Sequence, residues 1–267
     1  MWSYVRMGTK TGSIIKLMKQ HSRALQTEQY FEKQYCNSYG SPTNIKFIIY
    51  DNEMWQLCLK YIKESDLIAD YGFGGGTLLH NLAQLSKAKL FGIEQAEPAI
   101  LQSKTLIPKL NAVKGNIIET PLKSSCIDFI FSTMVIEHVD DKNLAEEVYR
   151  TLKPGGYFFV TSVIKAKHAW YFYKNVSGET VLEPTHLKEY KSIQELEAVL
   201  KPLGFTIVKS SVPRIRYPLL DPFFKLLAKC TGIKNLLEWK SIEFIRLLTQ
   251  IPIPGYFAAE ILAKKTH

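Results

Sequence analysis

The chain has 267 residues, of which 46% are hydrophobic and 22% charged, with 15 glycines and 12 prolines. This length and composition predict one elaborated globular α/β domain and exclude a disordered or fibrous chain. The longest unbroken apolar run, at 169–173, is far shorter than a membrane span of roughly 20 residues or a signal-peptide core of roughly 7–15, so we expect neither.

Four cysteines, Cys36, Cys58, Cys126 and Cys230, lie far apart and form no CxxC pair. This spacing argues against a zinc site and a disulfide scaffold, so we expect no metal and a cytoplasmic location. The formal charge of +9 is uneven, since residues 201–267 alone contribute +7. Such a basic periphery could meet nucleic acid, acidic lipid headgroups or an anionic substrate, or it could simply be a lysine-rich solvated surface.

Residues 1–65 precede the first expected strand and form an N-terminal helical extension, in which Met54, Leu57, Cys58 and Tyr61 share one helix face. From 66 to about 212, short apolar runs alternate with amphipathic stretches, as in parallel βαβ units. We expect strands at 67–70, 88–94, 111–114, 126–132, 157–160, 205–212 and 256–263. The expected helices cover 77–86, 98–110, 140–152 and 192–201.

Two segments, 164–191 and 213–254, interrupt the domain that spans 66–267, and we expect them on the substrate side. The first contains an aromatic run at 168–173, and the second contains two amphipathic stretches, 219–229 and 235–249, which Pro252 and Pro254 end. These parts could form a pocket wall, a peripheral membrane contact or a subunit interface, and the chain could be a monomer or a homodimer.

The most informative stretch is the turn between the first strand and the following helix. It places Gly72, Gly74 and Gly76 directly after Asp70, which lets a ligand approach bare backbone and helix N–H groups. The spacing differs from the GxGxxG of dinucleotide sites. Asp70 could brace the loop or meet a cationic ligand group, and Glu94, at the end of the second strand, has the place of a ribose-binding acid.

These features, together with Lys153-Pro154-Gly155-Gly156 before the fifth strand, make the chain resemble the class I S-adenosylmethionine-dependent methyltransferases. The type 11 branch, which contains the ubiquinone and menaquinone biosynthesis methyltransferases, is particularly similar through 129–132, 136–139 and 149–156. The resemblance implies a Rossmann-like, doubly wound and mostly parallel seven-stranded α/β sheet. Helices would cover both faces, the last strand would be antiparallel, and helical additions would join the core.

The resemblance also implies a cradle for S-adenosylmethionine. The glycines would lie against the methionine moiety, Glu94 would take both ribose hydroxyls and Gln95 would flank the adenine. Asn116 stands where the family usually has an aspartate facing the adenine amine, and Phe73 replaces a common cysteine. The implied cofactor-binding residues are Asp70, Gly72, Phe73, Gly74, Gly76, Glu94, Gln95, Asn116, Ile117, Ser132 and Thr133.

Methyl transfer from a sulfonium mainly requires that the acceptor be held in line and water be excluded. Some acceptors also need a general base, for which His138 and His186 are the candidates because histidine titrates near neutrality. Either histidine could instead be structural. His138 follows the fourth strand, and His186 resembles a histidine that often closes over the pocket in this family; Glu137 could orient either of them.

We therefore expect a methyltransferase that acts on a small organic acceptor, such as a lipid-like molecule or a biosynthetic intermediate. Two alternatives remain: an RNA or protein methyltransferase that uses the basic tails, and a non-catalytic binding protein on the same fold. The sequence holds no Asn/Asp-Pro-Pro-Tyr/Phe tetrapeptide after the fourth strand and no appended nucleic-acid module, which argues against nucleic acid as a partner.

Overall fold

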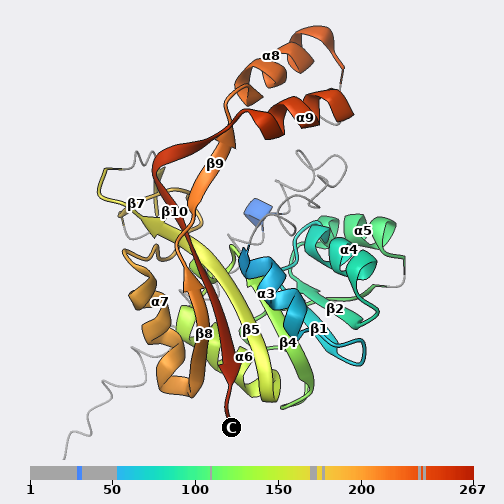
Figure 1. Cartoon of the computed structure of the whole chain (residues 1–267), viewed down its shortest axis with the longest axis vertical. Coiled ribbons are helices and arrows are strands. Elements are labelled where there is room, and N and C mark those ends of the chain that lie inside the picture. Colours follow the sequence, from blue (N-terminus) through green and yellow to red (C-terminus); the bar gives the residue numbers. More distant parts are fainter. Residues whose placement is uncertain are drawn as a thin grey trace, which may run out of the picture.

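The structure, a computed structural model, describes residues 29–31, 53–108, 110–168, 173–175, 178–233, 236 and 239–267. Most of the expected N-terminal extension, 1–65, lies outside these ranges, as does most of the aromatic run at 168–173. The part that is described is a sheet flanked by helices, with a helical pair projecting from one end (Figure 1).

The sheet has eight strands, seven of them in the order β3-β2-β1-β4-β5-β10-β8, and β9 pairs with β10. The first five of these run parallel, and β10 is antiparallel to both β5 and β8. This confirms the predicted mostly parallel, doubly wound sheet with an antiparallel last strand. The strands are β1 Leu67–Tyr71, β2 Lys89–Glu94, β3 Asn111–Lys114, β4 Ile127–Thr133, β5 Leu152–Lys165, β8 Phe205–Ser211, β9 Arg214–Pro218 and β10 Gln250–Lys265.

Helices cover both faces of the sheet, and each face has its own apolar cluster. One cluster joins α6 and α7 to the strands through residues such as Leu144, Val148 and Leu196. The other joins α3 and α4 to the opposite face through Met54 and Leu82. The helices are α3 Glu53–Tyr61, α4 Thr77–Leu85, α5 Glu97–Leu106, α6 Asp141–Thr151, α7 Ile193–Leu200, α8 Asp221–Thr231 and α9 Lys240–Leu248, with 3-10 turns η1 Ile136–His138 and η2 Lys201–Leu203.

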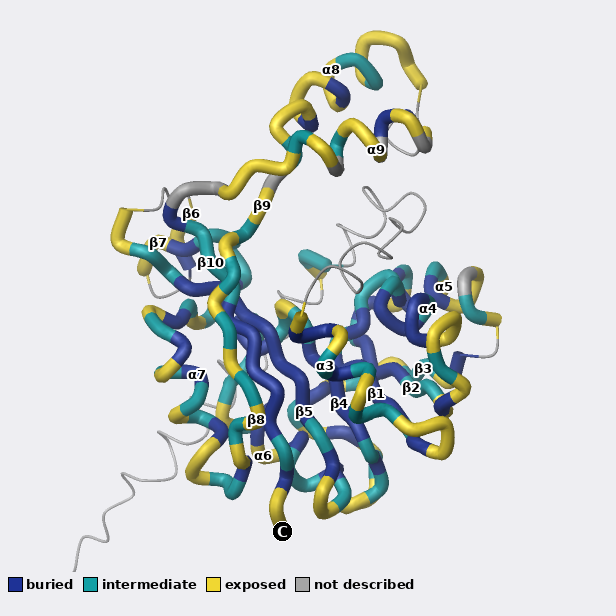
Figure 2. The backbone as a smooth tube through the Cα atoms, in the orientation of Figure 1, coloured by how far each residue is buried: buried dark blue, intermediate teal, exposed yellow. Residues whose placement is uncertain are grey.

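The core strands are buried as their apolar sequences predict. Ile130, Phe131, Phe158 and Phe159 are fully buried at the centre of the sheet, where helices cover both faces. The tube in Figure 2 shows this as a dark central sheet between partly exposed helices. The buried centre fixes where the parallel strands end, and so determines which loops meet at the carboxyl edge.

The second insertion, 213–254, differs from the expectation of helices alone. It begins with β9, and β10 starts at Gln250, so that Pro252 lies within a strand paired to Arg216 instead of ending a helix. Proline is accepted here because the pairing shifts register between Pro252 and Phe257, and a bulge needs fewer backbone donors. In the first insertion, 164–191, the described residues hold the end of β5, the short antiparallel pair β6 Tyr173–Lys174 and β7 Thr180–Val181, and a bridge between Ile164 and Tyr190.

The pair of helices α8 and α9 projects beyond the sheet and packs mainly on itself (Figures 1 and 2). Phe224, Leu236 and Ile242 form a small apolar cluster between the two helices. Large apolar side chains remain exposed on the pair, among them Phe223, Leu226, Phe244 and Leu248. None of the helices in the described ranges is both long and apolar enough to cross a bilayer.

Candidate functional site

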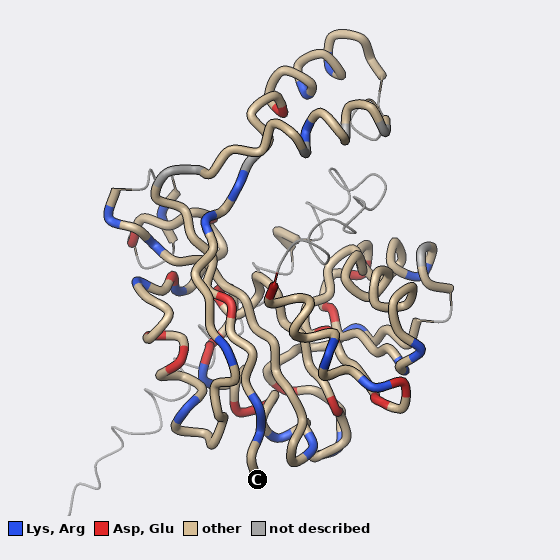
Figure 3. Tube along the Cα trace, in the orientation of Figure 1, with Lys and Arg blue, Asp and Glu red and all other residues tan. Residues whose placement is uncertain are grey.

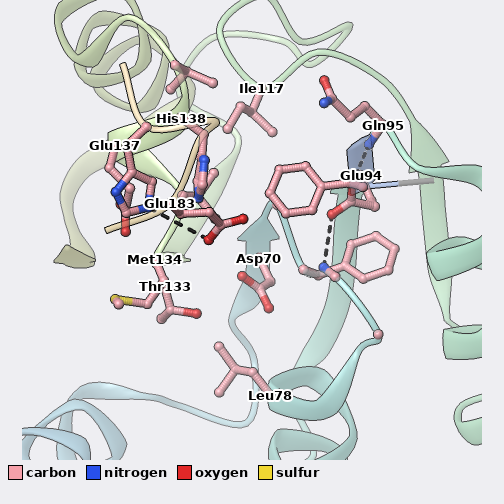
Figure 4. A pocket seen from close by; sticks show the side chains of 18 of the residues that line it. Asp70, Leu78, Glu94, Gln95, Ile117, Thr133, Met134, Glu137, His138 and Glu183 are labelled. Carbon is pink, nitrogen blue, oxygen red and sulfur yellow. Dashed lines mark hydrogen bonds and ion pairs between the residues drawn. The ribbon is translucent and has the colours of Figure 1, made fainter. Parts of the chain in front are cut away.

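A cavity of about 430 Å³ opens at the carboxyl edge of the sheet, where β1, β2 and β4 end (Figure 4). In an open α/β sheet, ligands bind at this edge, where the strand order reverses. The cavity is lined by Phe31, Asp70, Gly72, Phe73, Gly74, Gly75, Thr77, Leu78, Glu94, Gln95, Gly115, Ile117, Thr133, Met134, Val135, Glu137, His138, Val139, Val163, Leu182, Glu183 and His186.

The glycine turn between β1 and α4 forms one side of this cavity. Gly72, Gly74 and Gly76 all have positive φ, near +77°, +54° and +80°, which residues with a Cβ rarely adopt. A Cβ on Gly72 would lie 2.7 Å from a methyl of Val135, and one on Gly76 would lie 2.6 Å from Cβ of Ser103. The turn is therefore built for glycine, and it presents bare backbone to whatever occupies the cavity.

Glu94, at the end of β2, holds the turn from the side. Its carboxylate accepts backbone hydrogen bonds from Gly74 at 2.9 Å, Gln95 at 2.8 Å and Ala96 at 3.0 Å. The side chain is almost fully buried, and this burial raises its pKa although the three backbone donors act in the opposite direction. Glu94 thus connects the glycine turn to β2 and faces the cavity at the same time.

Asp70 lines the cavity between Glu94 and Thr133 (Figure 4). It is 1% exposed, and among the described residues its Oδ1 has no hydrogen-bond partner. Burial, with a further contribution from the charge of Glu94, raises the pKa of Asp70 to about 8. A buried carboxyl group with an unpartnered oxygen at a cavity wall is suited to a cationic group on a ligand.

The opposite side of the cavity carries two histidines and two glutamates (Figure 4). Glu137 and His138 lie on η1, directly after β4, while Glu183 and His186 come from the first insertion. The backbone N–H of Leu187 donates to the carbonyl of Glu137 at 2.7 Å, which joins the two segments. The rings of His138 and His186 then lie with their centroids 4.7 Å apart.

Burial dominates the electrostatics of this second wall. It lowers the pKa of His138 to about 3, with a smaller contribution from His186, and it raises the pKa of Glu137 to about 7. A histidine with so low a pKa is neutral at physiological pH but has little affinity for a proton. It is therefore a weak general base, and a neutral nitrogen donor of this kind is better suited to a hydrogen bond or to a cation.

The cavity brings together most of the residues predicted from the sequence, from distant parts of the chain. Those that line it are Asp70, Gly72, Phe73, Gly74, Glu94, Gln95, Ile117, Thr133, His138 and His186. Three predicted residues do not line it: Gly76, Asn116 and Ser132.

Each of these three has a local structural role in the structure. Gly76 lies at the N-cap of α4 against Ser103. The side-chain oxygen of Asn116 accepts the backbone N–H of Ile118 at 3.2 Å, as in a turn. Ser132 is fully buried, and its hydroxyl donates to the carbonyl of Tyr71 at 3.1 Å.

The cavity also contains residues that were not predicted as part of the site. Glu183 stands three residues before His186 in the sequence. The prediction of His186 as a site residue could therefore have been extended to Glu183. Met134, Val135 and Leu182 fill apolar parts of the wall, and Phe31 comes from the N-terminal extension. No pattern in the sequence connects Phe31 to the sheet, because that contact is purely tertiary.

The family model of the methyltransferase domain matches residues 69–160. A probable S-adenosylmethionine-dependent methyltransferase of Mycolicibacterium smegmatis is 26% identical over 52% of this chain and 52% of its own length. The mitochondrial ubiquinone biosynthesis O-methyltransferase of Rattus norvegicus is 30% identical, over 52% of this chain and 44% of that protein. The ribosomal protein L11 methyltransferase of Staphylococcus saprophyticus is also 30% identical, over 44% of this chain and 40% of that protein.

The chain thus spans about half the length of the curated relatives it matches, so their acceptors do not transfer to it directly. Among solved structures, phosphoethanolamine N-methyltransferase 2 of Haemonchus contortus, in complex with phosphomonomethylethanolamine and S-adenosylhomocysteine, superposes with a TM-score of 0.56. It is 17% identical, and the match covers 81% of this chain and 53% of that one. This similarity supports the class I methyltransferase fold.

Proposed function

From the match of residues 69–160 to the family model of the methyltransferase domain, we propose that the chain is an S-adenosylmethionine-dependent methyltransferase that transfers a methyl group to a small organic acceptor. One observation carries the proposal. A single cavity has the glycine turn, Asp70 and Glu94 on one side and the two histidines on the other. The donor and the acceptor can therefore be held face to face within one cavity.

The residues of the first wall fit S-adenosylmethionine in shape and charge. The bare turn at 72–76 would lie along its methionine part, Glu94 would meet the ribose hydroxyls and Gln95 would flank the adenine. The unpartnered oxygen of Asp70 is an acceptor for a cationic group, and this cofactor carries an ammonium and a sulfonium. The cofactor supplies an electrophilic methyl group, whose bond to sulfur breaks as a lone pair of the acceptor forms a new bond to carbon.

What remains for the protein is to position the acceptor and to exclude water. Thr133, Met134 and Val135 lie where β4 ends, between the two walls, and form an apolar and weakly polar floor. His138 and His186 face the cavity from the other side and can hydrogen-bond an acceptor oxygen or nitrogen. A volume of about 430 Å³ must hold both reactants, which favours a small acceptor over a nucleic acid or a folded protein.

Methyl-labelled S-adenosylmethionine, incubated with the full chain and a cell extract, tests this proposal. The extract is then separated into small-molecule, RNA and protein fractions. We expect label in the small-molecule fraction and its loss in Glu94→Ala, since that variant lacks the carboxylate beside the cofactor. Label in RNA or protein would replace the proposed acceptor class, and label in no fraction despite cofactor binding would support a non-catalytic binding protein.

We also propose that the pair α8–α9 docks on an acidic membrane surface at the cytoplasmic side, which would suit a lipid-like acceptor. Phe223 and Leu226 on α8, and Phe244 and Leu248 on α9, are each about 60% exposed or more. None of the described residues of this pair lines the cavity, which speaks against a pocket wall. Basic residues dominate the C-terminal part of the chain (Figure 3), and apolar side chains among positive charges are typical of interfacial helices.

Flotation with phosphatidylcholine vesicles that contain or lack 30 mol% phosphatidylglycerol, a composition chosen for the test, would examine this surface. We expect binding only to the acidic vesicles, and a several-fold loss in the double variant Phe223→Ser/Leu226→Ser with unchanged thermal unfolding. Absence of binding would contradict membrane docking. If the wild type is a dimer and the double variant is a monomer, the surface instead contacts a second copy of the chain.

A further inference from the structure

The second wall of the cavity contains a compact cluster of potential metal ligands. One ligand atom from each of Glu137, His138 and His186 lies within 4.8 Å of the corresponding atoms of the other two, and all three residues are buried or nearly so. Glu137 and His138 are brought together by the short turn η1, and His186 reaches them from the first insertion. The cluster faces Glu94 and Gln95 across the cavity (Figure 4).

Among the described residues, hydrogen bonds engage one polar atom of each residue of the cluster and leave a second one as a potential metal ligand. Nδ1 of His138 is 3.0 Å from Oγ1 of Thr185, and Nδ1 of His186 is 2.6 Å from a carboxylate oxygen of Glu189. These contacts fix both rings and leave each Nε2 as the remaining ligand atom. A carboxylate or hydroxyl behind the other ring nitrogen is the usual support of a metal-binding histidine.

Glu137 supplies the third ligand atom. Its Oε2 accepts a hydrogen bond from Ser162 at 3.1 Å, while its Oε1, fully buried, has no partner among the described residues. An unsatisfied carboxylate oxygen in a buried site costs free energy unless a cation or a donor meets it. This oxygen is therefore an independent indication that the site takes a ligand.

The charges of the cluster point to a cation. Three carboxylates, those of Glu137, Glu183 and Glu189, surround the two histidines, and within the described ranges no ion pair connects any of them to a lysine or an arginine. Nearby, Lys188 pairs with Asp141 instead. A divalent ion would balance most of this negative charge without a basic side chain.

We propose that this cluster binds one divalent first-row transition-metal ion. Glu137 Oε1 and Nε2 of His138 and of His186 are its ligands, and Glu183, whose carboxylate lies 3.9 Å from Nε2 of His186, adds negative charge beside them. Two imidazoles with carboxylates suit Zn²⁺, Mn²⁺, Fe²⁺ or Co²⁺ better than Ca²⁺, which prefers oxygen ligands alone. Ligand atoms that bind a tetrahedral ion at about 2.1 Å are about 3.4 Å apart, so the atoms of this cluster must approach one another by up to about 1.4 Å.

The proposal departs from the expectation of no metal, which was drawn from the spacing of the cysteines alone. It also deepens the proposed function, on which its role rests. A histidine that binds the ion would no longer act as a general base, and the ion would lie in the wall of the cavity proposed to receive the acceptor. An acceptor hydroxyl bound there would have a lower pKa and would present its oxygen to the methyl group.

Cobalt is the probe of choice, because Co²⁺ occupies such sites and its visible absorption reports the ligands. The full chain, treated with a chelator and freed from it, is titrated with Co²⁺ in the absence of S-adenosylmethionine and followed by absorption and calorimetry. We expect one ion per chain, a Kd in the micromolar range or below, visible bands and a higher Tm. Glu137→Gln, which keeps the side-chain volume, is expected to weaken binding at least tenfold.

Two further variants separate the site from nonspecific histidine binding. Glu189→Gln, which supports His186 from behind, is expected to weaken binding by about 10- to 100-fold. His168→Ala, on an exposed histidine outside the cluster, is expected to leave the affinity unchanged. Absence of Co²⁺ binding by the wild type at 1 mM, or equal affinity in the wild type and Glu137→Gln, would overturn the proposal.

Cofactor affinity, measured on the same chelator-treated protein, keeps this test separate from the proposed function. Loss of Co²⁺ binding with intact S-adenosylmethionine binding would refute the metal site alone. Co²⁺ binding without any affinity for S-adenosylmethionine would refute the proposed function and leave the metal site in place.

Discussion

From the buried carboxyl of Asp70 we predict that S-adenosylmethionine binding is coupled to the release of a proton. In the protein without cofactor, the pKa of Asp70 is raised to about 8, first by burial and then by the charge of Glu94. At pH 7 the carboxyl is therefore protonated in about nine of ten molecules. A cationic cofactor favours the ionised form, so binding must expel this proton, and up to about 0.9 proton is released per cofactor at pH 7.

The assay is isothermal titration with S-adenosylmethionine at pH 7 in buffers that differ in ionisation enthalpy. The slope of the apparent binding enthalpy against the buffer enthalpy gives the number of protons released. We expect a slope that corresponds to roughly 0.5–0.9 proton at pH 7 and approaches zero at pH 9.5, where Asp70 is already ionised. Asp70→Asn, which has nearly the same volume but does not titrate, is the matched control.

The reasoning would be refuted by a wild type that binds the cofactor without proton release at pH 7, or by the same release in Asp70→Asn. The stability of the cofactor-free protein provides a second check. Because the native state keeps the proton to a higher pH than the unfolded chain, the free energy of unfolding should fall as pH rises from about 4 to about 8. Asp70→Asn should remove that part of the pH dependence.

Three substitutions test packing and hydrogen bonding within the domain. In Gly76→Ala the new Cβ would lie 2.6 Å from Ser103 on a backbone with positive φ, so urea denaturation should show a free energy of unfolding lower by about 2–4 kcal/mol. Gly75→Ala is the control: its Cβ would lie 3.5 Å from the nearest neighbour, and it should lower the free energy of unfolding by less than about 1 kcal/mol. Glu147→Gln replaces a buried carboxylate that accepts hydrogen bonds from the N–H and the hydroxyl of Thr120, and should lower the free energy of unfolding by about 1–3 kcal/mol. An unchanged urea midpoint would contradict this role.

Local patterns in the sequence were sufficient for the parallel core. The short strand at 111–114 was predicted with the bounds that the structure gives it, because four residues between clear helix and turn signals leave little choice. Asp140 caps α6 by accepting the N–H of Asn143, and Leu144 and Val148 are buried as the helical spacing predicts. Such elements depend on neighbours in the chain, which is why single-sequence reasoning reaches them.

Elements that depend on partners distant in the chain were placed less well. β9 was not predicted, since its five residues are stabilised by β10, about 35 residues later. The same pairing carries β10 through Pro252, which local rules read as the end of a helix. The length of such a strand depends on which residues of the neighbouring strand it pairs with, and local sequence patterns do not specify that pairing.

The candidate site likewise contains residues that local patterns identify and contacts that only the fold creates. Glu94 and the glycine turn were recognisable because their spacing along the chain already places them at one loop. His138 and His186 were predicted separately, and only the fold brings their rings to 4.7 Å from each other. The supporting contacts of Thr185 and Glu189, and with them the argument for a metal ion, exist only in three dimensions.

The most direct test of the central claim is isothermal titration of the chain with S-adenosylmethionine and S-adenosylhomocysteine, repeated on Glu94→Ala. We predict one site with a micromolar Kd for both ligands and a loss of at least tenfold in the variant, because Glu94 holds the glycine turn at Gly74 and is proposed to contact the ribose of the ligand. No binding of either ligand at millimolar concentration, or equal affinity in Glu94→Ala, would contradict it.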